Sequence, residues 1–557
     1  MSCAMVSNSS LREEPLQAGG SEERQVLTYE EALVLVGTGR VQRRMLLLCG
    51  LANASDAVEL LCVSLVLPAV GPDGASLRLS VPQLASLSAA LFWGAMVGTL
   101  VWGALSDAIG RRKSLSLAMA VAGSFGLLSA TAGSFGTLVL CRTLAGIGVG
   151  GSIPVVYAWL SEWLTTEARG RYMVLLASSW MVGSICTALA GLAVVPRHPV
   201  NGWRWFLALA ALPSAVCCVW AHMTAPESPR WLLSRGRSEE ALALLRKAAA
   251  DNGREGAIPV HATLSKPKAG ADAASGSLVE MLKVQGKAIV SLFSPPLRKI
   301  SLPLCLVWFG ISLGWYGTVL WFPEYFKSRA AAANIAPPGP PPAPGAPPPH
   351  LDASPFTAQL AVAASNLPGN LVSMWSVDAL GRRMTLASSL AAGALAALAF
   401  AFMPANAGQG GALAAACAFN ALSVGAWNAL ECYSAELLPT SVRASGLGVF
   451  SAAGKFGSIA GQMVNGALLP VAQWAPLLPG VGTMLLAAVL VMRMSTETRG
   501  RAMMDDVPDE STRDAGGSDD GDGAAGDDET GVVRHASDVQ DVELTHLLSK
   551  HGDVDRT

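Results

Sequence analysis

Apolar runs of about 20 residues recur along the chain, and they constrain its fold more than any other feature. Each run is long enough to cross the ~30 Å hydrocarbon core of a bilayer as an α-helix. Six runs are expected at 45–68, 84–105, 115–132, 135–160, 173–195 and 203–222, and six more at 300–323, 357–377, 385–403, 411–433, 446–469 and 474–493. The sequence therefore predicts an all-α integral membrane protein with about twelve transmembrane helices in two six-helix bundles.

Composition agrees with a membrane protein. The chain is 51% hydrophobic and 14% charged, whereas soluble domains carry about 25% charged residues. Its formal net charge of −2 disfavours nucleic acid as a partner. The first forty residues are polar and show no cleavable signal peptide, so we expect the N-terminus in the cytosol.

The order of polar and apolar stretches predicts five parts. These are a cytosolic N-terminal segment (1–44), a first bundle (45–224), a cytosolic linker (225–298), a second bundle (299–493) and an acidic, disordered cytosolic tail (494–557). A proline-rich extracytoplasmic loop at 336–355 is expected to be a stiff spacer rather than a docking ligand. In the first part, "TYEE" places Thr28 and Glu31 as a capping box, and Gly37 and Gly39 would end that short amphipathic helix.

Basic residues indicate the orientation. The runs "GRRK" (110–113), "RGR" (169–171) and "GRR" (381–383), together with Arg443, fall on the side of the N-terminus and the linker. By the positive-inside rule, both termini are expected in the cytosol.

The two halves repeat one another. "GALSDAIGRRKSL" after the second run recurs as "MWSVDALGRRMTL" after the eighth, with an offset of 271 residues. "SEWLTTEARGR" after the fourth run recurs as "AELLPTSVRASG" after the tenth, with an offset of 274. Two halves in one register are typical of transporters that rock two bundles about a pseudo-two-fold axis.

Two carboxylates lie inside the first apolar run. In "LANASDAVELLCVSLVLPAV", Asp56 and Glu59 are three residues apart and share one helical face. Each ionised acid near the bilayer centre costs roughly 3 kcal/mol on insertion scales, so both must face a wet or paired interior. They are either an inert hydrogen-bonded pair or part of an ion or substrate path, and we favour the path.

Several motifs resemble the major facilitator superfamily, in its sugar-porter and organic-ion branch. They are "GALSDAIGRRK", "RTLAGIGVGG" (142–151) and "PESPRWLL" (226–233). "TYEEALVLVGTGRVQ", "SDAVELL" and "PVVYAWLSEWL" resemble the synaptic-vesicle-protein-related (SVOP-like) transporters more closely. The resemblance covers Thr28 to Arg501. The pair of glutamines that sugar porters carry in the seventh span is absent from "WFGISLGWYG", which favours an organic ion over a sugar.

The resemblance implies two groups of charged residues with a role in transport. The first is a proton-linked pair between a first-span acid, Asp56 or else Glu59, and Arg142 of the fourth span; Arg142 could instead serve helix packing. The second is an ion-pair network that closes the cytosolic gate, formed by Asp107, Arg111, Arg112, Glu162, Arg169, Glu227, Arg230, Asp378, Arg382, Glu436 and Arg443. A single exposed pair is worth at most about 1 kcal/mol, so only the network could hold a conformation.

Further polar and aromatic residues lie in mid-span. Glu431 and Lys455 form either a salt bridge with each other or a substrate-ion contact, and the sequence does not decide between them. Cavity candidates that could equally be interhelix contacts are Trp315, Tyr316, Asn366, Asn370, Asn428 and Gln462.

These features predict a secondary active transporter of a small organic solute in the bilayer, with protons coupled by symport. The alternatives are a non-transporting receptor or trafficking scaffold with the same fold, and an uncoupled facilitator. No enzyme chemistry, metal cluster or cofactor motif is expected. The membrane is either the plasma membrane or an endosomal or vesicular one. "ELTHLL" offers a possible sorting-adaptor motif at Glu543, Leu547 and Leu548.

Overall fold

The computed structural model describes residues 25–74, 76–265, 286–287, 289–333, 351–404, 408–439 and 442–499. The chain divides into two compact units, Met1–Val507 and Pro508–Thr557. The second unit, with the predicted sorting motif at Glu543, Leu547 and Leu548, lies outside the described residues, as do the rest of the acidic tail after residue 499 and the proline run at 336–350.

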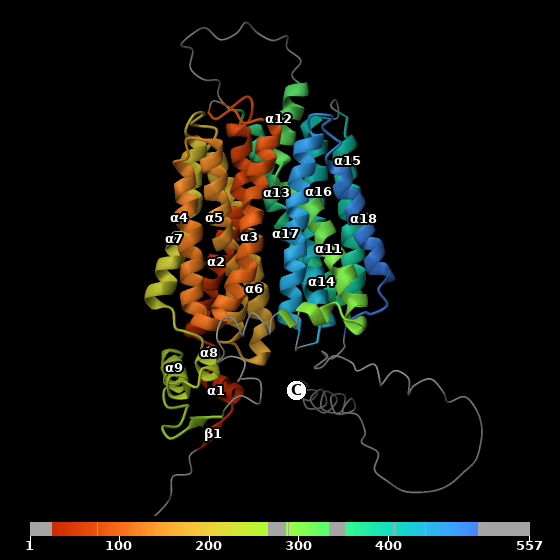
Figure 1. Cartoon of the computed structure of the whole chain (residues 1–557). Coiled ribbons are helices and arrows are strands. Elements are labelled where there is room, and N and C mark those ends of the chain that lie inside the picture. The colour runs from red at the N-terminus through yellow and green to blue at the C-terminus, as the bar shows by residue number, and fades with distance from the viewer. Residues whose placement is uncertain are drawn as a thin grey trace, which may run out of the picture. The chain divides into compact units, whose positions relative to one another are not determined.

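Two helical halves stand side by side, coloured red to yellow and green to blue in Figure 1. The first half consists of α2 (Arg40–Val70), α3 (Val81–Ile109), α4 (Arg111–Ala130), α5 (Phe135–Ser161), α6 (Thr166–Val194) and α7 (Gly202–Thr224). The second consists of α11 (Pro295–Val319), α12 (Phe322–Ala333), α13 (Ser354–Ala364), α14 (Asn366–Leu380), α15 (Arg382–Phe402), α16 (Gly408–Leu437), α17 (Arg443–Leu468) and α18 (Leu477–Arg493).

Among the described residues, nine helices are long and apolar enough to cross a membrane. They are α2 to α7, α11, α15 and α16. The other three predicted spans coincide with α13 together with α14, with α17, and with α18. The predicted all-α membrane fold is confirmed.

Two predicted spans are broken rather than continuous, and proline explains both breaks. The seventh, expected at 300–323, ends as α11 at Val319 and resumes as α12, in which Pro323 occupies the second position. The eighth, expected at 357–377, is interrupted at Ser365 between α13 and α14. Pro368 cannot donate to the carbonyl of Ala364, so one hydrogen bond of a continuous helix is missing at this break.

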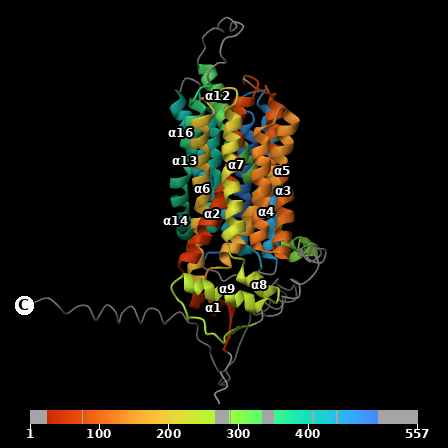
Figure 2. The ribbon, with the colours of Figure 1, turned by 90° about the vertical axis from the view of Figure 1, so that its left-hand side faces the viewer.

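A small platform covers one end of the first half (Figure 2). It comprises β1 (Val26–Leu27), α1 (Tyr29–Val36), α8 (Pro229–Ser234), α9 (Ser238–Asp251) and β2 (Thr263–Leu264), with β1 parallel to β2. The Asn252 amide, just after α9, donates to the carbonyls of Val36 and Gly37 and so joins linker to N-terminal segment. This strand pair was not predicted, because two residues give no periodic pattern. We call this end of the bundle the platform end, and the other the opposite end.

The predicted capping box is confirmed. The amide of Glu31 donates to the Thr28 hydroxyl, and the amide of Thr28 donates to Oε2 of Glu31 at 2.8 Å. Helix α1 ends at Gly37, as predicted. These hydrogen bonds hold the pKa of Glu31 below its usual value. The cap is therefore complete above that pKa, and its contribution is lost as the pH falls through it.

Replacing Thr28 by alanine is expected to loosen α1 without disturbing the bundles. Loss of an N-cap side chain typically costs about 1 kcal/mol, so amide hydrogen exchange over 29–36 should accelerate about fivefold. Thr28→Ser, which keeps the hydroxyl, should exchange like wild type. Equal exchange in the alanine and serine variants would show that the cap does not hold α1.

The two halves touch each other at the middle and toward the opposite end. A Cβ added at Gly466 of α17 would lie 2.5 Å from Cβ of Ala85 on α3. Near the opposite end, Nζ of Lys327 on α12 lies 3.3 Å from Asp73, just after α2. Among the described residues, no ion pair at the platform end connects the two halves. Each pair there lies either within the first half and its platform or within the second half. This conformation is therefore closed at the opposite end.

Lys327→Gln is expected to favour opening at that end. Because Asp73 is largely exposed, the pair is worth at most about 1 kcal/mol, and the open population should rise by up to fivefold. Spin labels at positions 78 and 352, one in each half, would report this as a larger long-distance fraction. Glu240→Gln, which breaks an exposed pair on the platform, should leave the distance distribution unchanged. An unchanged distribution in Lys327→Gln would show that the contact between Lys327 and Asp73 does not hold the opposite end closed.

Candidate binding and coupling site

A buried ion pair joins α5 to α2. Nη1 of Arg142 lies 2.8 Å from Oε2 of Glu59, and the two side chains are 1% and 0% exposed. Nη2 of Arg142 also donates to the Glu59 carbonyl at 2.5 Å and contacts Sγ of Cys62 at 3.2 Å. The expected pairing of Arg142 with Asp56 is wrong. Arg142 lies close to the N-terminus of α5 at the opposite end, and Glu59 lies nearer that end of α2 than Asp56 does.

The pair leaves one carboxylate oxygen without a partner. Among the described residues, Oε1 of Glu59 has no hydrogen-bond partner, and neither has Nε of Arg142. Next to Oε1 is Gly126 of α4, where an added Cβ would come within 2.5 Å of that oxygen. Oε1 occupies the space that a side chain at Gly126 would fill. Because Arg142 binds Oε2, Oε1 is the oxygen that can accept a proton without first displacing the arginine.

Asp56 is equally buried and has a different set of partners. The Ser152 hydroxyl donates to its Oδ2, while Oδ1 has no hydrogen-bond partner in the described part of the chain. The charge of Asp56 also interacts with that of Lys455, which lies on α17 in the other half. Asp56 thus links the two halves electrostatically, whereas Glu59 and Arg142 lie within one half.

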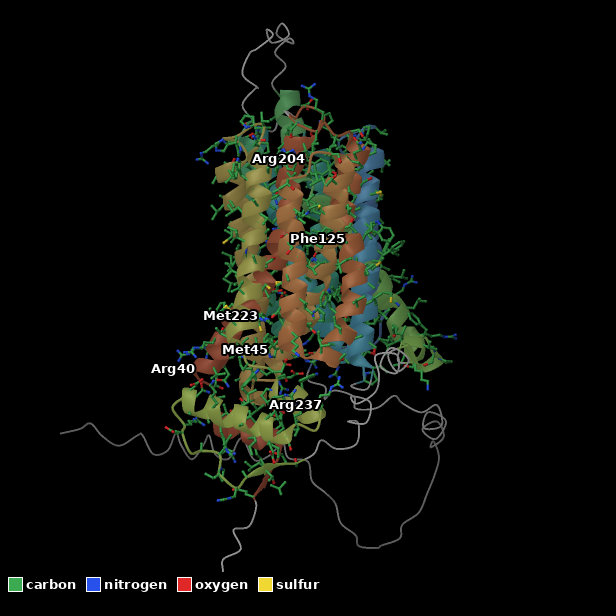
Figure 3. The ribbon with its side chains drawn as sticks, turned by 60° about the vertical axis from the view of Figure 1, so that its left-hand side comes forward. Arg40, Met45, Phe125, Arg204, Met223 and Arg237 are labelled. Atoms are coloured by element: carbon green, nitrogen blue, oxygen red, sulfur yellow. The ribbon has the colours of Figure 1, made fainter. Side chains whose placement is uncertain are left out.

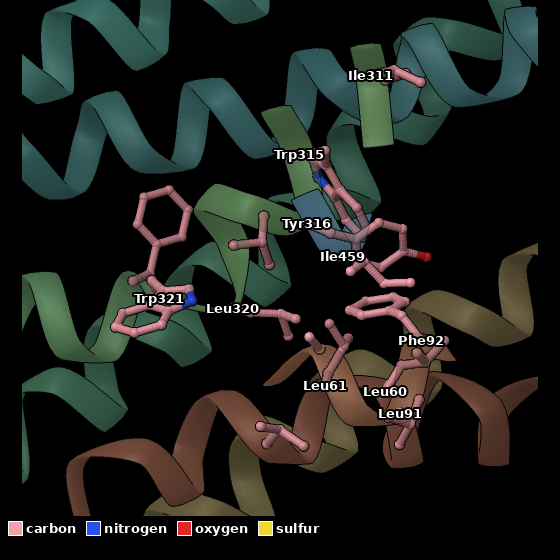
Figure 4. Close-up of a cluster of buried hydrophobic side chains, with 14 of the residues drawn as sticks. Leu60, Leu61, Leu91, Phe92, Ile311, Trp315, Tyr316, Leu320, Trp321 and Ile459 are labelled. Atoms are coloured by element: carbon pink, nitrogen blue, oxygen red, sulfur yellow. The ribbon is translucent and has the colours of Figure 1, made fainter. Parts of the chain in front are cut away.

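An aromatic cluster occupies the middle of the interface between the halves. Its rings are Trp308, Trp315 and Tyr316 of α11, Trp427 of α16 and Phe92 of α3. Figure 4 shows Tyr316 facing Phe92, with their centroids 4.9 Å apart. Trp427 lies 5.6 to 6.1 Å from the three rings of α11.

Three charged groups surround Tyr316 of this cluster. Nζ of Lys455 lies 6.0 Å from the ring centroid, and the charges of Glu431 and Asp56 both interact with Tyr316. Glu431 also interacts with Tyr157 of α5, in the other half. Glu431 is exposed and Lys455 is half-buried. No salt bridge joins them among the described residues, so of the two options for this pair the direct bridge is excluded.

The mid-span amides bind neighbouring helices instead. Asn366 accepts from Asn420 at 2.7 Å, and Asn370 accepts from Asn428 at 2.8 Å. Gln462 accepts from Trp321 at 2.7 Å and donates to the Tyr316 carbonyl. These groups stabilise helix packing around the aromatic cluster, and Gln462 anchors the backbone of Tyr316.

Two matching ion-pair clusters lie at the platform end. In the first half, Arg111 bonds Asp107 and lies 3.1 Å from Glu162. In the second half, the equivalent Arg382 lies 3.6 Å from Asp378 and 3.2 Å from Glu436. Each cluster fastens the ends of three helices within its own half.

A carboxylate completes each cluster from the chain after the last helix of each half. Glu227 accepts from the amides of Arg111 and Arg112 at 2.8 and 3.1 Å. Glu497 accepts from the amides of Arg382 and Arg383 at 3.0 and 3.2 Å. A side chain at Gly110 or Gly381 would collide with these carboxylates, and both glycines have positive φ, near +100° and +89°. Glu497 was not predicted, although "ET" at 497–498 matches "ES" at 227–228 with an offset of 270 residues.

Four expected members of the gate network make other contacts. The Arg112 and Arg443 guanidinium groups donate to the carbonyls of Ala225 and Leu438, respectively. Arg169 lies 3.7 Å from Glu30 of the platform. Arg230 is exposed, and among the described residues it has no ion pair. The side chains of Arg112, Arg169 and Arg443 thus bind carbonyls or a platform acid, and none of the four joins the acids of the network within the described part of the chain.

Comparison with known proteins gives a family match over most of the chain. The model described as "Sugar (and other) transporter" matches residues 39–289 and 350–505. Organic cation/carnitine transporter 7 of Arabidopsis thaliana is 31% identical over 518 residues, covering 86% of this chain and 96% of that protein. Synaptic vesicle 2-related protein of Xenopus laevis is 29% identical over 480 residues, covering 86% of this chain and 82% of that protein.

Other relatives share only part of their length or only the fold. Synaptic vesicle glycoprotein 2A of Rattus norvegicus is 31% identical over 335 residues, which is 55% of this chain and 45% of that protein. This chain thus spans less than half of that relative. The partially occluded inward-open structure of the xylose transporter XylE from E. coli has a TM-score of 0.61 at 18% identity, over 83% of this chain and 100% of that one.

Proposed function

The chain belongs to the sugar (and other) transporter family, and from this premise we propose that it is a proton-coupled transporter of a small organic cation. It is a multi-pass membrane protein with the fold of membrane transporters. In the proposal, both termini and the platform lie in the cytosol, and the substrate binds midway between the halves.

The charge at the aromatic cluster supports a cation. Two carboxyl groups, those of Asp56 and Glu431, and one amino group, that of Lys455, interact with Tyr316, so acidic groups outnumber basic ones there. A cation over tryptophan or tyrosine gains about 0.5 kcal/mol at an exposed site and about 2 kcal/mol when desolvated. The combination of an accessible carboxylate, Glu431, and the rings of Trp427 and Tyr316 is the observation that carries the proposal. The name of the Arabidopsis relative agrees with this substrate class.

Proton coupling is proposed for the Glu59–Arg142 pair. A proton on the free Oε1 of Glu59 would neutralise the carboxylate and weaken its hold on Arg142. Arg142 could then move relative to α2, which changes the packing of α5 within the first half. Proton coupling, which the sequence assigned first to Asp56, is therefore proposed for Glu59. Asp56 is proposed to interact with Lys455 across the interface between the halves.

The clusters at the platform end support alternating access. Because Arg111 and Arg382 each bind acids of their own half, the clusters keep each half rigid without joining the two at that end. The halves can then rock about the aromatic cluster as two bodies. The cytosolic gate expected from the sequence would have to close between the two halves. It would need a rearrangement in which the acids of each cluster face the other half.

A binding assay tests the substrate class. The full-length protein in detergent would be titrated with tetraethylammonium, benzoate and xylose, with tryptophan fluorescence as readout. We expect saturable quenching of tryptophan fluorescence by the cation, at concentrations where the anion and the sugar cause no quenching. Saturable binding of xylose or benzoate without the cation would overturn the proposed substrate class, and binding of none of the three would favour a scaffold that has kept the fold.

A further inference from the structure

Three exposed arginines lie together at the start of α2. Arg40, Arg43 and Arg44 are all exposed, and Leu47, one turn further along, is 62% exposed. At 100° per residue these four side chains fall within an arc of about 100°. The other face of the same turns, with Val41, Met45 and Leu48, is buried. The helix therefore presents a basic strip that continues into an apolar one.

These arginines differ from several other arginines at this end. Arg111 and Arg382 bind acids within the bundle, Arg169 reaches Glu30, and Arg237 pairs with Glu240. Over the described ranges, the guanidinium groups of Arg40, Arg43 and Arg44 have no ion pair and no hydrogen bond. Their charge is therefore available to a group outside the chain.

The strip lies at the depth of phospholipid headgroups. Helix α2 has 31 residues, so it is about 46 Å long, which exceeds the ~30 Å hydrocarbon core and matches a bilayer with its headgroups. The arginines occupy its first turn and a half, at the platform end, and Figure 3 places Arg40 at the edge of the bundle just above the platform. Leu47 then lies where the hydrocarbon begins.

The neighbouring helix offers an apolar surface at the same depth. Sγ of Cys217 on α7 contacts the Leu48 carbonyl of α2, which sets the level of the two antiparallel helices. Around this level and on toward the platform end, α7 has a shallow groove lined by Ala215, Val216, Val219, Trp220, Met223 and Thr224. Met223 is 73% exposed. An acyl chain has a surface to follow while its headgroup stays level with the arginines.

We propose that Arg40, Arg43 and Arg44 form a binding site for the headgroup of an anionic phospholipid in the leaflet on the platform side. Guanidinium groups pair with phosphate and carboxylate oxygens through paired N–H donors. Each basic residue near an anionic membrane surface strengthens binding by about fivefold. The site is independent of the substrate and of proton coupling.

The test measures binding of fluorescent phosphatidylserine to the full-length protein in a neutral detergent. Arg43→Gln/Arg44→Gln is expected to bind this lipid about 25-fold more weakly than wild type, with phosphatidylcholine binding weakly to both. The matched control is Arg237→Gln/Lys247→Gln, which removes the same charge from exposed positions of the platform. It should bind phosphatidylserine like wild type.

Three outcomes would overturn the site. They are equal loss in the control, unchanged binding in the test variant, and displacement of the lipid by millimolar inorganic phosphate, which would indicate a site for a free anion. If the glutamine variant does not fold, Arg43→Lys/Arg44→Lys replaces it. That variant keeps the charge and should retain binding within a few-fold, and loss of binding in the folded lysine variant would contradict the electrostatic account.

Discussion

Replacing Glu59 by glutamine is expected to abolish transport driven by a pH gradient while leaving passive exchange of substrate intact. Glutamine keeps an oxygen facing Arg142 but cannot take up or release a proton. With one proton per substrate, a gradient of one pH unit is worth about 1.4 kcal/mol and supports about tenfold accumulation. In Glu59→Gln the ratio should fall to about one, measured in proteoliposomes with the membrane potential clamped.

Stability must be separated from coupling in this variant. Removing one partner of a buried ion pair can cost roughly 3–5 kcal/mol, because the remaining charge is left unpaired. Glu59→Gln/Arg142→Gln removes both charges, so it should unfold closer to wild type and still fail to accumulate substrate. Asp56→Asn provides the comparison within the same helix and should keep coupling. Coupling that survives in folded Glu59→Gln but is lost in Asp56→Asn would return the role to Asp56.

Replacing Glu431 by glutamine or Trp427 by alanine is expected to weaken binding of an organic cation about 30-fold each. The first change removes the exposed carboxylate near Tyr316, and the second removes a ring that lies within 6.1 Å of three others. A desolvated cation–π contact is worth about 2 kcal/mol, which corresponds to that factor. Titration of tetraethylammonium into the purified variants measures both effects.

Matched controls exist for both changes. Trp205 is 65% exposed on α7, and Glu240 is an exposed acid on α9 of the platform. Trp205→Ala and Glu240→Gln should bind the cation like wild type. If Trp427→Ala binds as tightly as Trp205→Ala does, the aromatic cluster is a packing core and the substrate binds elsewhere.

The fold follows from the sequence because its main determinants are local. Apolar run length predicts helices, and the repeated "GRR" and acid–arginine motifs predict two equivalent halves. What local patterns miss are interruptions inside an apolar run. Pro323 and Pro368 break the seventh and eighth spans, and both prolines were visible, but in a membrane neighbouring helices often satisfy the freed carbonyls, so a proline alone does not predict a break.

The site was predicted in part. Spacing placed Asp56 and Glu59 on one helical face, but the choice of partner for Arg142 depends on how α2 and α5 are shifted along each other, and no sequence pattern specifies that shift. Trp308 was missed although it lies seven residues before Trp315 and hence on the same face of α11. Trp427 was missed in the same way, one turn before Glu431. A search for aromatic residues at helical spacing from Trp315 and from Glu431 would have found both.

The central claim is that this chain moves an organic cation by using a proton gradient. The most direct measurement is uptake of labelled tetraethylammonium by wild-type proteoliposomes, with and without a pH gradient at clamped potential, beside protein-free liposomes. The account predicts accumulation above the equilibrium level that disappears when the gradient is collapsed. Uptake that only equilibrates, whatever the gradient, would contradict coupling and indicate a facilitator, and no uptake by folded protein of this or any other organic cation would contradict the transport claim itself.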